Sequence, residues 1–365
     1  MQFERSEDPA CFDTFAAEWN ALLAESITRV PFLTPEYLRT WWAHRGGGEW
    51  PEARLALITA RDEAGRLVGI APLFSAVNRD SRPALLLLGS IEISDYLDLV
   101  VRPEHAEAFV AGLLEHLAGD PGWEVLDLYN LQASSPTRAA LARAAAERGW
   151  GASEQVLEQT PAIPLPTDFE TYLANQVEKK ERQEIRRKVR RAENGEQTVT
   201  WRLVGPTDDV NLQTDSFLEL MALNPDKARF LTPPMRAQFR DTVRAMSARG
   251  LLHLAFLDVD GEPAAGYLSF DDGKRLYVYN SAIDPRFNAL SAGWVLLAYL
   301  IQWSITNGRT VFDFLRGHED YKFRFGGVAG RILRLQVTRA GALTGDPIPS
   351  LNPDEAPVFP PEAAQ

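Results

Sequence analysis

The sequence predicts an α/β (α+β) protein with two mixed-sheet domains in tandem, related by internal duplication. Apolar or alternating segments, which are typical of strands, alternate with longer segments of helical spacing. The length of 365 residues is enough for two domains. Two patterns occur twice: strand, charged turn and strand at 58–75 and 255–270, and strand, proline loop, helix and strand at 96–131 and 276–315. Chance similarity among α/β units is the alternative to duplication.

Residues 1–160 are predicted to form the first domain. Helical spacing predicts an opening helix with one apolar face: Phe12, Phe15, Ala16, Trp19, Leu22 and Leu23. Thr34-Pro35 predicts a capped helix that carries two adjacent tryptophans, Trp41 and Trp42. A hairpin is expected at 54–60 and 67–77. Further strands are expected at 85–89, 96–101 and 123–128, and helices from 103 and over 135–149.

Residues 161–345 are predicted to form the second domain. Three prolines in 160–167 indicate a linker, and a charged, basic helix over 178–193 follows it. A second hairpin is expected at 251–258 and 263–270. The remaining elements are strands at 276–283, 310–315 and 331–339 and an almost wholly apolar helix at 294–306. Residues 346–365 are a proline-rich tail.

Composition narrows the class of protein. The net charge of −12 argues against a general nucleic-acid coat. A single cysteine, Cys11, permits no internal disulfide, and the five histidines are scattered, so we expect a cytoplasmic protein without a metal site. The N-terminus does not resemble a signal peptide. The longest apolar run, 294–301, is far shorter than the roughly 20 residues of a membrane span.

The junction between the strand at 276–283 and the following helix is the strongest candidate for a ligand site. Small residues, Ser291, Ala292 and Gly293, let a ligand approach the backbone there. The free N–H groups of a helix start favour an anion, and Arg286 adds a positive charge. A pyrophosphate suits such a site. The alternative is a tight turn in which Ser291 caps the helix.

The residues that follow carry a family resemblance. The sequence DFLRGHEDYKFRFG at 313–326 resembles the Asp-Phe-x-x-Gly…(Phe/Tyr)-Lys-x-x-Phe-Gly ending of the FemX-like (FemAB) and CelD-like branch of the GNAT acyltransferases, which has two GNAT-type halves. Of the usual loop signature only Arg286 is kept, because Ala289 and Leu290 stand where a glycine is usual.

The resemblance implies acetyl-CoA or another acyl-CoA as co-substrate, and no metal. It places the acyl carrier against the strand end and loop of the second half, and the pantetheine amides along the strand end at Asn280 and Ser281. The expected contacts are Ser281, Ile283, Arg286, Phe287, Asn288, Ala289, Leu290, Ser291, Ala292 and Gly293.

Three residues are candidates for the chemistry. By resemblance, Tyr321 is the proton donor to the leaving group, and Lys322 holds phosphate or stabilises negative charge. A packing tyrosine and a solvated surface lysine are the alternatives. The spacing of Asp313 predicts a buried carboxylate, which must be paired or protonated. Arg316 or Lys322 would be its partner, or Asp313 would act as a base.

The first half has acids and no glycine at its corresponding loop, so we expect it to form a wall for the acceptor, with the reaction in a cleft between the halves. Asp95 and Tyr96, and one of the paired tryptophans, Trp41, are acceptor-side candidates. Arg182 and Arg186 of the basic helix, with Arg316, are candidates for binding a phosphorylated acceptor, the CoA phosphate or a tRNA end; a solvated face is the ordinary explanation of such a helix.

The sequence therefore predicts an N-acyltransferase that moves an acyl group, expected to be acetyl, from acyl-CoA to an amine of a small-molecule, carbohydrate or peptide acceptor. One alternative is a FemX-like transferase that uses aminoacyl-tRNA and acts on a cell-wall precursor. The other is a non-catalytic GNAT scaffold in polysaccharide biosynthesis.

Overall fold

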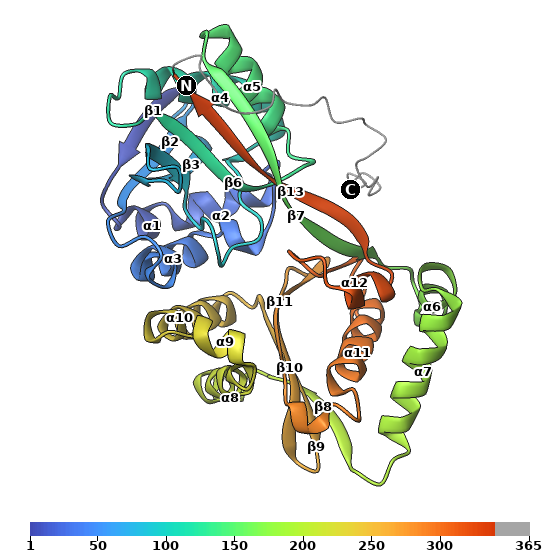
Figure 1. The fold of residues 1–365 in the computed structure, drawn as a ribbon. Helices are drawn as coiled ribbons and strands as arrows, with labels where there is room; N and C mark the ends of the chain where they lie inside the picture. Colours follow the sequence, from blue (N-terminus) through green and yellow to red (C-terminus); the bar gives the residue numbers. More distant parts are fainter. Residues whose placement is uncertain (340–365) are drawn as a thin grey trace. The chain divides into compact units, whose positions relative to one another are not determined.

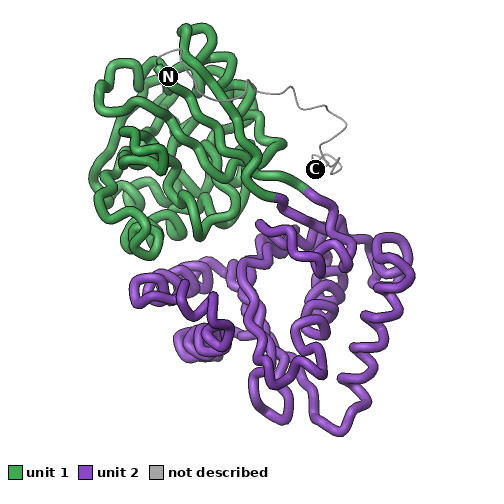
Figure 2. The backbone as a smooth tube through the Cα atoms, in the orientation of Figure 1, with its two compact units in different colours: residues 1–158, 330–356 green, residues 159–329, 357–365 purple. Residues whose placement is uncertain are grey.

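The computed structural model describes residues 1–339, which divide into two compact units (Figure 2). Unit 1 consists of residues 1–158 together with 330–339, and unit 2 consists of residues 159–329. The last strand, which we expected in the second domain, therefore lies in unit 1 from Gly330 onward. The predicted tail at 346–365 lies outside the described residues.

Unit 1 is built on a mixed sheet with the strand order β1-β2-β3-β4-β6-β13-β7, and β5 pairs with β3. The strands β2 and β3 form the predicted hairpin, while β4 runs parallel to β6. Strand β1 was not predicted. The strands are β1 Gln2–Ser6, β2 Arg54–Arg61, β3 Leu67–Val77, β4 Pro83–Leu87, β5 Val100–Val101, β6 Val125–Gln132, β7 Gly151–Pro164 and β13 Val328–Thr338.

Helices cover this sheet, with α2 packed against β3 and β5 and α4 packed against β1 and β3 (Figure 1). The expected opening helix is broken at Phe15 into α1 and α2. The predicted cap is present, since the Thr34 side chain accepts from the Tyr37 N–H. The helices are α1 Cys11–Thr14, α2 Ala16–Ala24, α3 Pro35–Gly48, α4 Ala106–Ala118 and α5 Thr137–Glu147, with short 3-10 turns at Pro31–Leu33 and Pro103–His105.

The segment at 96–99 is irregular rather than the strand that we predicted, because a buried carboxylate organises it. Asp98 is fully buried and accepts from the hydroxyls of Thr28 at 2.5 Å, Ser135 at 2.6 Å and Thr137 at 2.5 Å. The Leu99 N–H adds a fourth hydrogen bond at 2.8 Å. A buried carboxylate needs such donors to offset the loss of its hydration.

Unit 2 has the strand order β7-β12-β11-β10-β9-β8, in which only β11 and β12 are parallel. Helix α11 and, beyond it, α6 and α7 lie on one face of the sheet, and α8, α9 and α10 lie on the other (Figure 1). The strands not yet given are β8 Val199–Leu203, β9 Leu252–Val259, β10 Glu262–Asp271, β11 Arg275–Ile283 and β12 Val311–Asp313.

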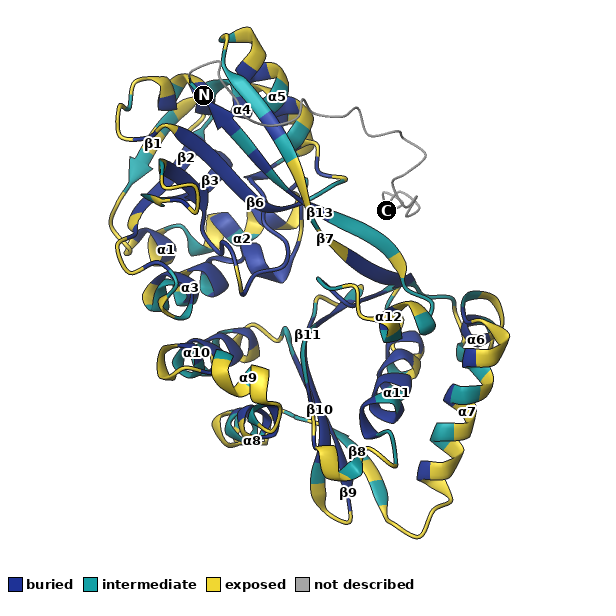
Figure 3. Ribbon diagram, in the orientation of Figure 1, coloured by how far each residue is buried: buried dark blue, intermediate teal, exposed yellow. Residues whose placement is uncertain are grey.

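The helices of unit 2 include the two predicted from the sequence, the apolar α11 and the basic α7. Helix α11 is mostly buried, while α7 is exposed along its outer side (Figure 3). The helices are α6 Phe169–Gln176, α7 Lys179–Glu193, α8 Val210–Ala222, α9 Pro225–Phe230, α10 Pro233–Ala248, α11 Ala292–Thr306 and α12 Asp320–Arg324, with a 3-10 turn at Pro285–Phe287.

The proline-rich segment 160–167 is not a linker over its whole length, which corrects the sequence prediction. Strand β7 continues through Pro164, and Ala162 to Pro164 pair with β12 in unit 2. The carbonyl of Pro161 accepts from the Phe314 N–H at 2.9 Å. Pro161 therefore joins the strand through its carbonyl, and the backbone N–H that proline lacks is not needed there. Strand β7 thus passes from unit 1 into unit 2.

Candidate functional site

The two parallel strands β11 and β12 separate near the middle of unit 2. They pair only from Arg275 with Val311 to Tyr277 with Asp313. Beyond Tyr277, β11 continues to Ile283 and stays paired with β10, with a bulge beside Leu268 and Ser269. The second half of β11 therefore has no strand neighbour on the β12 side. A strand edge of this kind can accept an extended ligand that has amide groups.

The loop that follows β11 leads directly to the start of α11. Ser291 has a left-handed backbone, with φ of 60°, and its side chain does not cap the helix. Within the described residues, no hydrogen-bond acceptor faces the backbone N–H groups of Ala292 and Gly293. Both residues are buried. Buried N–H donors without partners are rare, and each costs about 1–3 kcal/mol unless something supplies an acceptor.

The side chain of Ile283 lies over this helix start. A Cβ atom on Gly293 would meet Ile283 Cδ1 at 2.5 Å, and Ala292 has no exposed surface. Ile283 itself is 39% exposed, so it lies at the surface beside the helix start.

Arg286 is already paired, so it is not a free positive charge. Its guanidinium bonds the buried carboxylate of Asp284 at 2.7 Å and that of Glu262 at 3.0 Å. The hydrogen bond from Arg286 holds the pKa of Asp284 below its usual range. The remaining loop residues Phe287, Asn288, Ala289 and Leu290 form successive turns, in which Leu290 N–H donates to Phe287 O and Ser291 N–H donates to Asn288 O.

Tyr321 lies on α12 and is partly buried against the core of unit 2. Its ring packs edge-on against Phe314, with centroids 6.1 Å apart. Burial raises the pKa of the Tyr321 phenol, and the charge of Glu319 raises this pKa further. The phenol therefore keeps its proton at neutral pH, as a proton donor must.

Lys322 is not a surface lysine: it is 3% exposed. Its ammonium bonds Glu319 Oε2 at 2.9 Å and the carbonyls of Arg316 and Gly317. It therefore holds the turn at 316–319 closed. Asp313 is fully buried, as predicted.

The ion-pair partner of Asp313 is Arg275 on the neighbouring strand, at 3.3 Å. The other oxygen of Asp313 accepts from the Leu315 N–H at 2.8 Å. Leu315 has a φ of 56°, so the carboxylate supports a left-handed turn directly after β12. These bonds hold the end of β12 in place, and a catalytic role for Asp313 stays a prediction.

Lys227 on α9 is a residue that sequence reasoning missed. Its ammonium donates to Asn280 Oδ1 at 2.9 Å and to the carbonyl of Ser281, both in the part of β11 that has no strand neighbour on the β12 side. Burial lowers the pKa of Lys227 to about 8; Glu319 raises this pKa and Lys322 lowers it. No sequence motif marks Lys227, because its position depends on how α9 packs.

The basic helix α7 packs along α11 and reaches the β11–α11 loop. Arg191 donates to the carbonyl of Ala289, and Lys188 lies 4.0 Å from the centre of the Trp294 ring. Arg186 pairs with Glu170, and Arg182 donates to the carbonyl of Ala174. Part of the positive charge of α7 is therefore paired with acceptors within the protein.

The acceptor-side candidates of the first half are not at a surface. Trp41 has no exposed area and packs against Phe74, with ring centroids 5.3 Å apart. Asp95 and Tyr96 are 6% and 1% exposed. All three side chains are thus buried, and their contact with an acceptor stays a prediction from the sequence.

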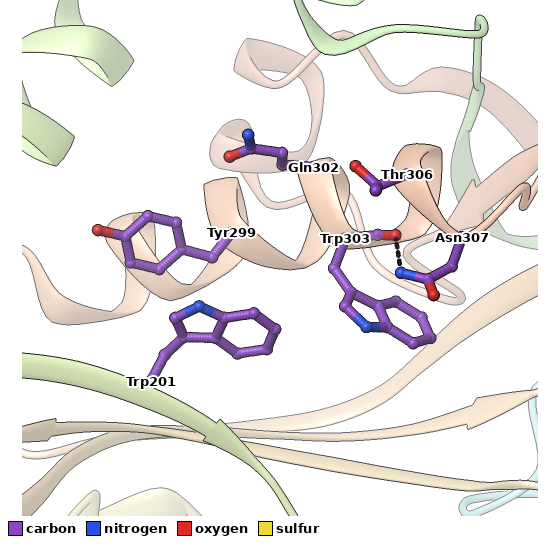
Figure 4. Close-up of a pocket in the computed structure, with 6 residues that line it drawn as sticks. All are labelled: Trp201, Tyr299, Gln302, Trp303, Thr306 and Asn307. Carbon is purple, nitrogen blue, oxygen red and sulfur yellow. Dashed lines mark hydrogen bonds between the residues drawn. The ribbon is translucent and has the colours of Figure 1, made fainter.

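A separate hollow lies at the other end of α11 (Figure 4). It is lined by Trp201, Tyr299, Gln302, Trp303, Thr306 and Asn307. Trp201 stacks on Tyr299 with centroids 6.2 Å apart, and beneath it the buried His253 packs on Trp303 at 4.3 Å. Neither ring nitrogen of His253 has a hydrogen-bond partner, and burial lowers the pKa of His253 to about 4.

Residues 1–339 contain no cluster of three or more His, Cys, Asp or Glu side chains that could hold a metal ion. Over the same residues, every helix is too short or too polar to pass through a bilayer.

The family comparison agrees with this geometry. Residues 179–323 match the family model of the acetyltransferase (GNAT) domain, which is less than half of the chain. The resemblance to the GNAT superfamily is thereby confirmed, and this part of unit 2 is a GNAT-type domain. No curated protein is significantly similar to the chain in sequence.

Solved structures extend the likeness to both units. A structure of FemX aligns with a TM-score of 0.62 at 13% identity, over 92% of this chain and 97% of that chain. A conserved protein of unknown function from Bacteroides thetaiotaomicron gives 0.60 at 15% identity, over 92% and 100%. A tandem GNAT protein from the clavulanic acid biosynthesis pathway gives 0.50 at 14%, over 94% and 100%. At these identities the likeness establishes the fold, which is the predicted tandem of GNAT-like α+β units.

Proposed function

We propose that the protein is an N-acyltransferase whose unit 2 transfers an acyl group, expected to be acetyl, from acyl-CoA to an acceptor amine. The observation that carries the proposal is the separation of β11 from β12 after Tyr277, together with the contact of Ile283, at the end of β11, with the start of α11. Binding of a phosphopantetheine thioester needs two features, and both are present here. One is the edge of β11 without a strand neighbour, and the other is the pair of N–H groups without acceptors at the start of α11. The GNAT match over the same residues supports it.

The residues present fit such a co-substrate. The pantetheine amides would lie along the second half of β11, where they would compete with the bonds that the Ser281 N–H makes to Asn280 Oδ1 and the Ser281 carbonyl makes to Lys227. The N–H groups of Ala292 and Gly293 would donate hydrogen bonds to the pyrophosphate oxygens, since the start of a helix favours an anion. Acyl-CoA supplies an activated thioester. Its binding would satisfy two donors that are otherwise unpaired.

Tyr321 would donate the proton that the leaving thiolate needs. Its burial keeps the phenol protonated, and the charge of Glu319 acts on it from the neighbouring turn. Lys322, which is bound to three oxygens, would keep the turn at 316–319 in place and so fix the position of Tyr321. Asp313 supports the left-handed turn at Leu315, which directly precedes the turn at 316–319.

Calorimetry and thiol release test this proposal separately. In calorimetry, wild type should bind acetyl-CoA with a micromolar Kd, and Tyr321→Phe should keep that Kd. With a panel of amines as acceptors, the rate of thiol release by Tyr321→Phe should fall about 100-fold below that of wild type. Thr306→Val, at the opposite end of α11, is the matched control. Absence of binding of any acyl-CoA by wild type would overturn the proposal.

The aminoacyl-tRNA alternative rests on α7. Its exposed cations include Lys179, Lys180 and Arg190, and Arg191 reaches the loop at Ala289. If tRNA were the donor, filter binding should show an affinity that falls steeply with salt. Binding of tRNA without binding of acyl-CoA would favour this alternative. Activity that is indifferent to Tyr321→Phe would instead point to a scaffold or another site.

A further inference from the structure

Lys227 holds a position that the family resemblance does not explain. It is half-buried on α9, a helix that packs on α8, and its ammonium reaches across to the end of β11. Both of its hydrogen-bond partners there are neutral oxygens, Asn280 Oδ1 and Ser281 O. A tetrahedral amine that donates twice has one position left, which holds either a proton or a lone pair.

The charges around Lys227 come from one turn and from its own helix. Glu319 and Lys322 influence it from the turn at 316–322, and these two form an ion pair of 2.9 Å with each other. On α9, Asp226 and Arg229 pair with each other. Lys227 therefore has no carboxylate hydrogen-bonded to it within the described residues, whereas Lys322 does.

One carboxylate connects the groups of this site. Glu319 bonds Lys322 directly, and its charge acts on both Lys227 and Tyr321. The lysine on the β11 side and the phenol on the β12 side thus share a neighbour, at the place where the two strands have separated. Acyl transfer to an amine needs a proton acceptor and a proton donor on opposite sides of the reacting carbonyl.

We propose that neutral Lys227 is the proton acceptor for the attacking amine, an inference that rests on the proposed acyltransferase function. The amine nitrogen forms a bond to the thioester carbonyl carbon, and the carbon–sulfur bond breaks. One proton passes from the amine nitrogen to Lys227 Nζ, and Tyr321 gives its proton to the leaving sulfur. Solvent then returns Lys227 and Tyr321 to their starting states. The lowered pKa, about 8, is consistent with a lysine that is partly neutral at physiological pH.

The first experiment needs no acceptor. Trace labelling of the whole protein with acetic anhydride from pH 6.5 to 10.5, read by peptide mass spectrometry, should show Lys227 titrating near pH 8. The exposed Lys274 serves as the internal reference for reagent reactivity. A Lys227 midpoint at or above pH 10 would overturn the proposal, whatever the protein catalyses.

The second experiment separates a base from a fixed positive charge. Lys227→Arg keeps the charge but cannot accept a proton, so thiol release from acetyl-CoA with the amine panel should fall about 100-fold, as in Lys227→Met. The limb near pH 8 in kcat/KM should disappear in both variants. The Kd for acetyl-CoA should stay within about threefold, and circular dichroism should confirm folding.

The outcomes distinguish the two proposals. Lys227→Arg activity within threefold of wild type would overturn the role of Lys227 and leave the acyltransferase function standing. Failure of wild type to bind acetyl-CoA would overturn the proposed function and, with it, the role of Lys227 in acyl transfer. Lys274→Met is the matched control and should behave as wild type does in both assays.

Discussion

The ammonium of Lys227 donates a hydrogen bond of 2.9 Å to the amide oxygen of Asn280, at the point where β11 has left its parallel neighbour. The same amide oxygen accepts from the Ser281 N–H at 2.9 Å. A neutral acceptor orients the lysine without adding a negative charge, so the low pKa of this amine depends on Asn280 remaining an amide.

Asn280→Asp should therefore raise the pKa of Lys227. A carboxylate at hydrogen-bond distance favours the charged lysine and should move its titration upward by about one unit or more from about 8. Trace labelling with acetic anhydride measures the midpoint directly. An unchanged midpoint would mean that burial alone determines the pKa of this amine.

Arg286→Ala should weaken acetyl-CoA binding although Arg286 is not free. Its removal leaves the carboxylates of Asp284 and Glu262 unpaired beside the loop, and uncompensated negative charge repels a pyrophosphate. We expect a loss in affinity of about tenfold, measured by calorimetry and larger at low salt. Arg66→Ala, which removes an exposed arginine paired with Asp62 in the first hairpin of unit 1, is the matched control, and equal Kd values for the two variants would contradict the expectation.

Asp98→Ala should destabilise unit 1. Three hydroxyls, those of Thr28, Ser135 and Thr137, would lose their buried acceptor. Leaving buried donors unsatisfied predicts a loss on the order of 3 kcal/mol in the free energy of unfolding. Urea unfolding measures it, with the exposed Glu104→Ala as control. A loss below about 1 kcal/mol would show that water replaces the carboxylate.

His253 should make stability depend on pH. Burial lowers its pKa to about 4 from 6.5, so the unfolded chain binds more protons than the folded one between these values. Its stabilising contribution, present in full above pH 6.5, is therefore lost as the pH falls toward 4, by at most roughly 3 kcal/mol. His253→Phe should flatten this part of the stability profile relative to wild type. Urea unfolding at pH 7 and pH 4.5 measures the change in stability. An equal loss of stability between these pH values in wild type and His253→Phe would contradict the prediction.

Local patterns in the sequence were sufficient for much of the fold. The two hairpins, helix α11 and the cap at Thr34 follow from residue spacing and turn chemistry, which act over a few positions. The buried state of Asp313 also follows from strand alternation. Its partner could not be predicted, because Arg275 meets it only through the parallel register of β11 and β12.

The missed features depend on long-range contacts. Lys227 is an ordinary lysine until α9 places it on β11, and Trp41, Asp95 and Tyr96 resemble exposed functional residues until their burial is known. Strand β7 continues through two prolines, Pro161 and Pro164, and at Pro161 the neighbouring Phe314 N–H needs an acceptor rather than a donor. The contacts of the β11–α11 loop with a ligand stay a prediction from the resemblance.

Strand β13 lies between β6 and β7 in the sheet of unit 1, although it is the last described strand of the chain. During synthesis on the ribosome, unit 2 is therefore complete in the nascent polypeptide before unit 1 receives its closing strand. Residues 159–329 can fold as one continuous stretch, whereas residues 1–158 must wait with two sheet edges unprotected. A premature stop near Ala329 should thus be more harmful to the half of the protein made first than to the half made last.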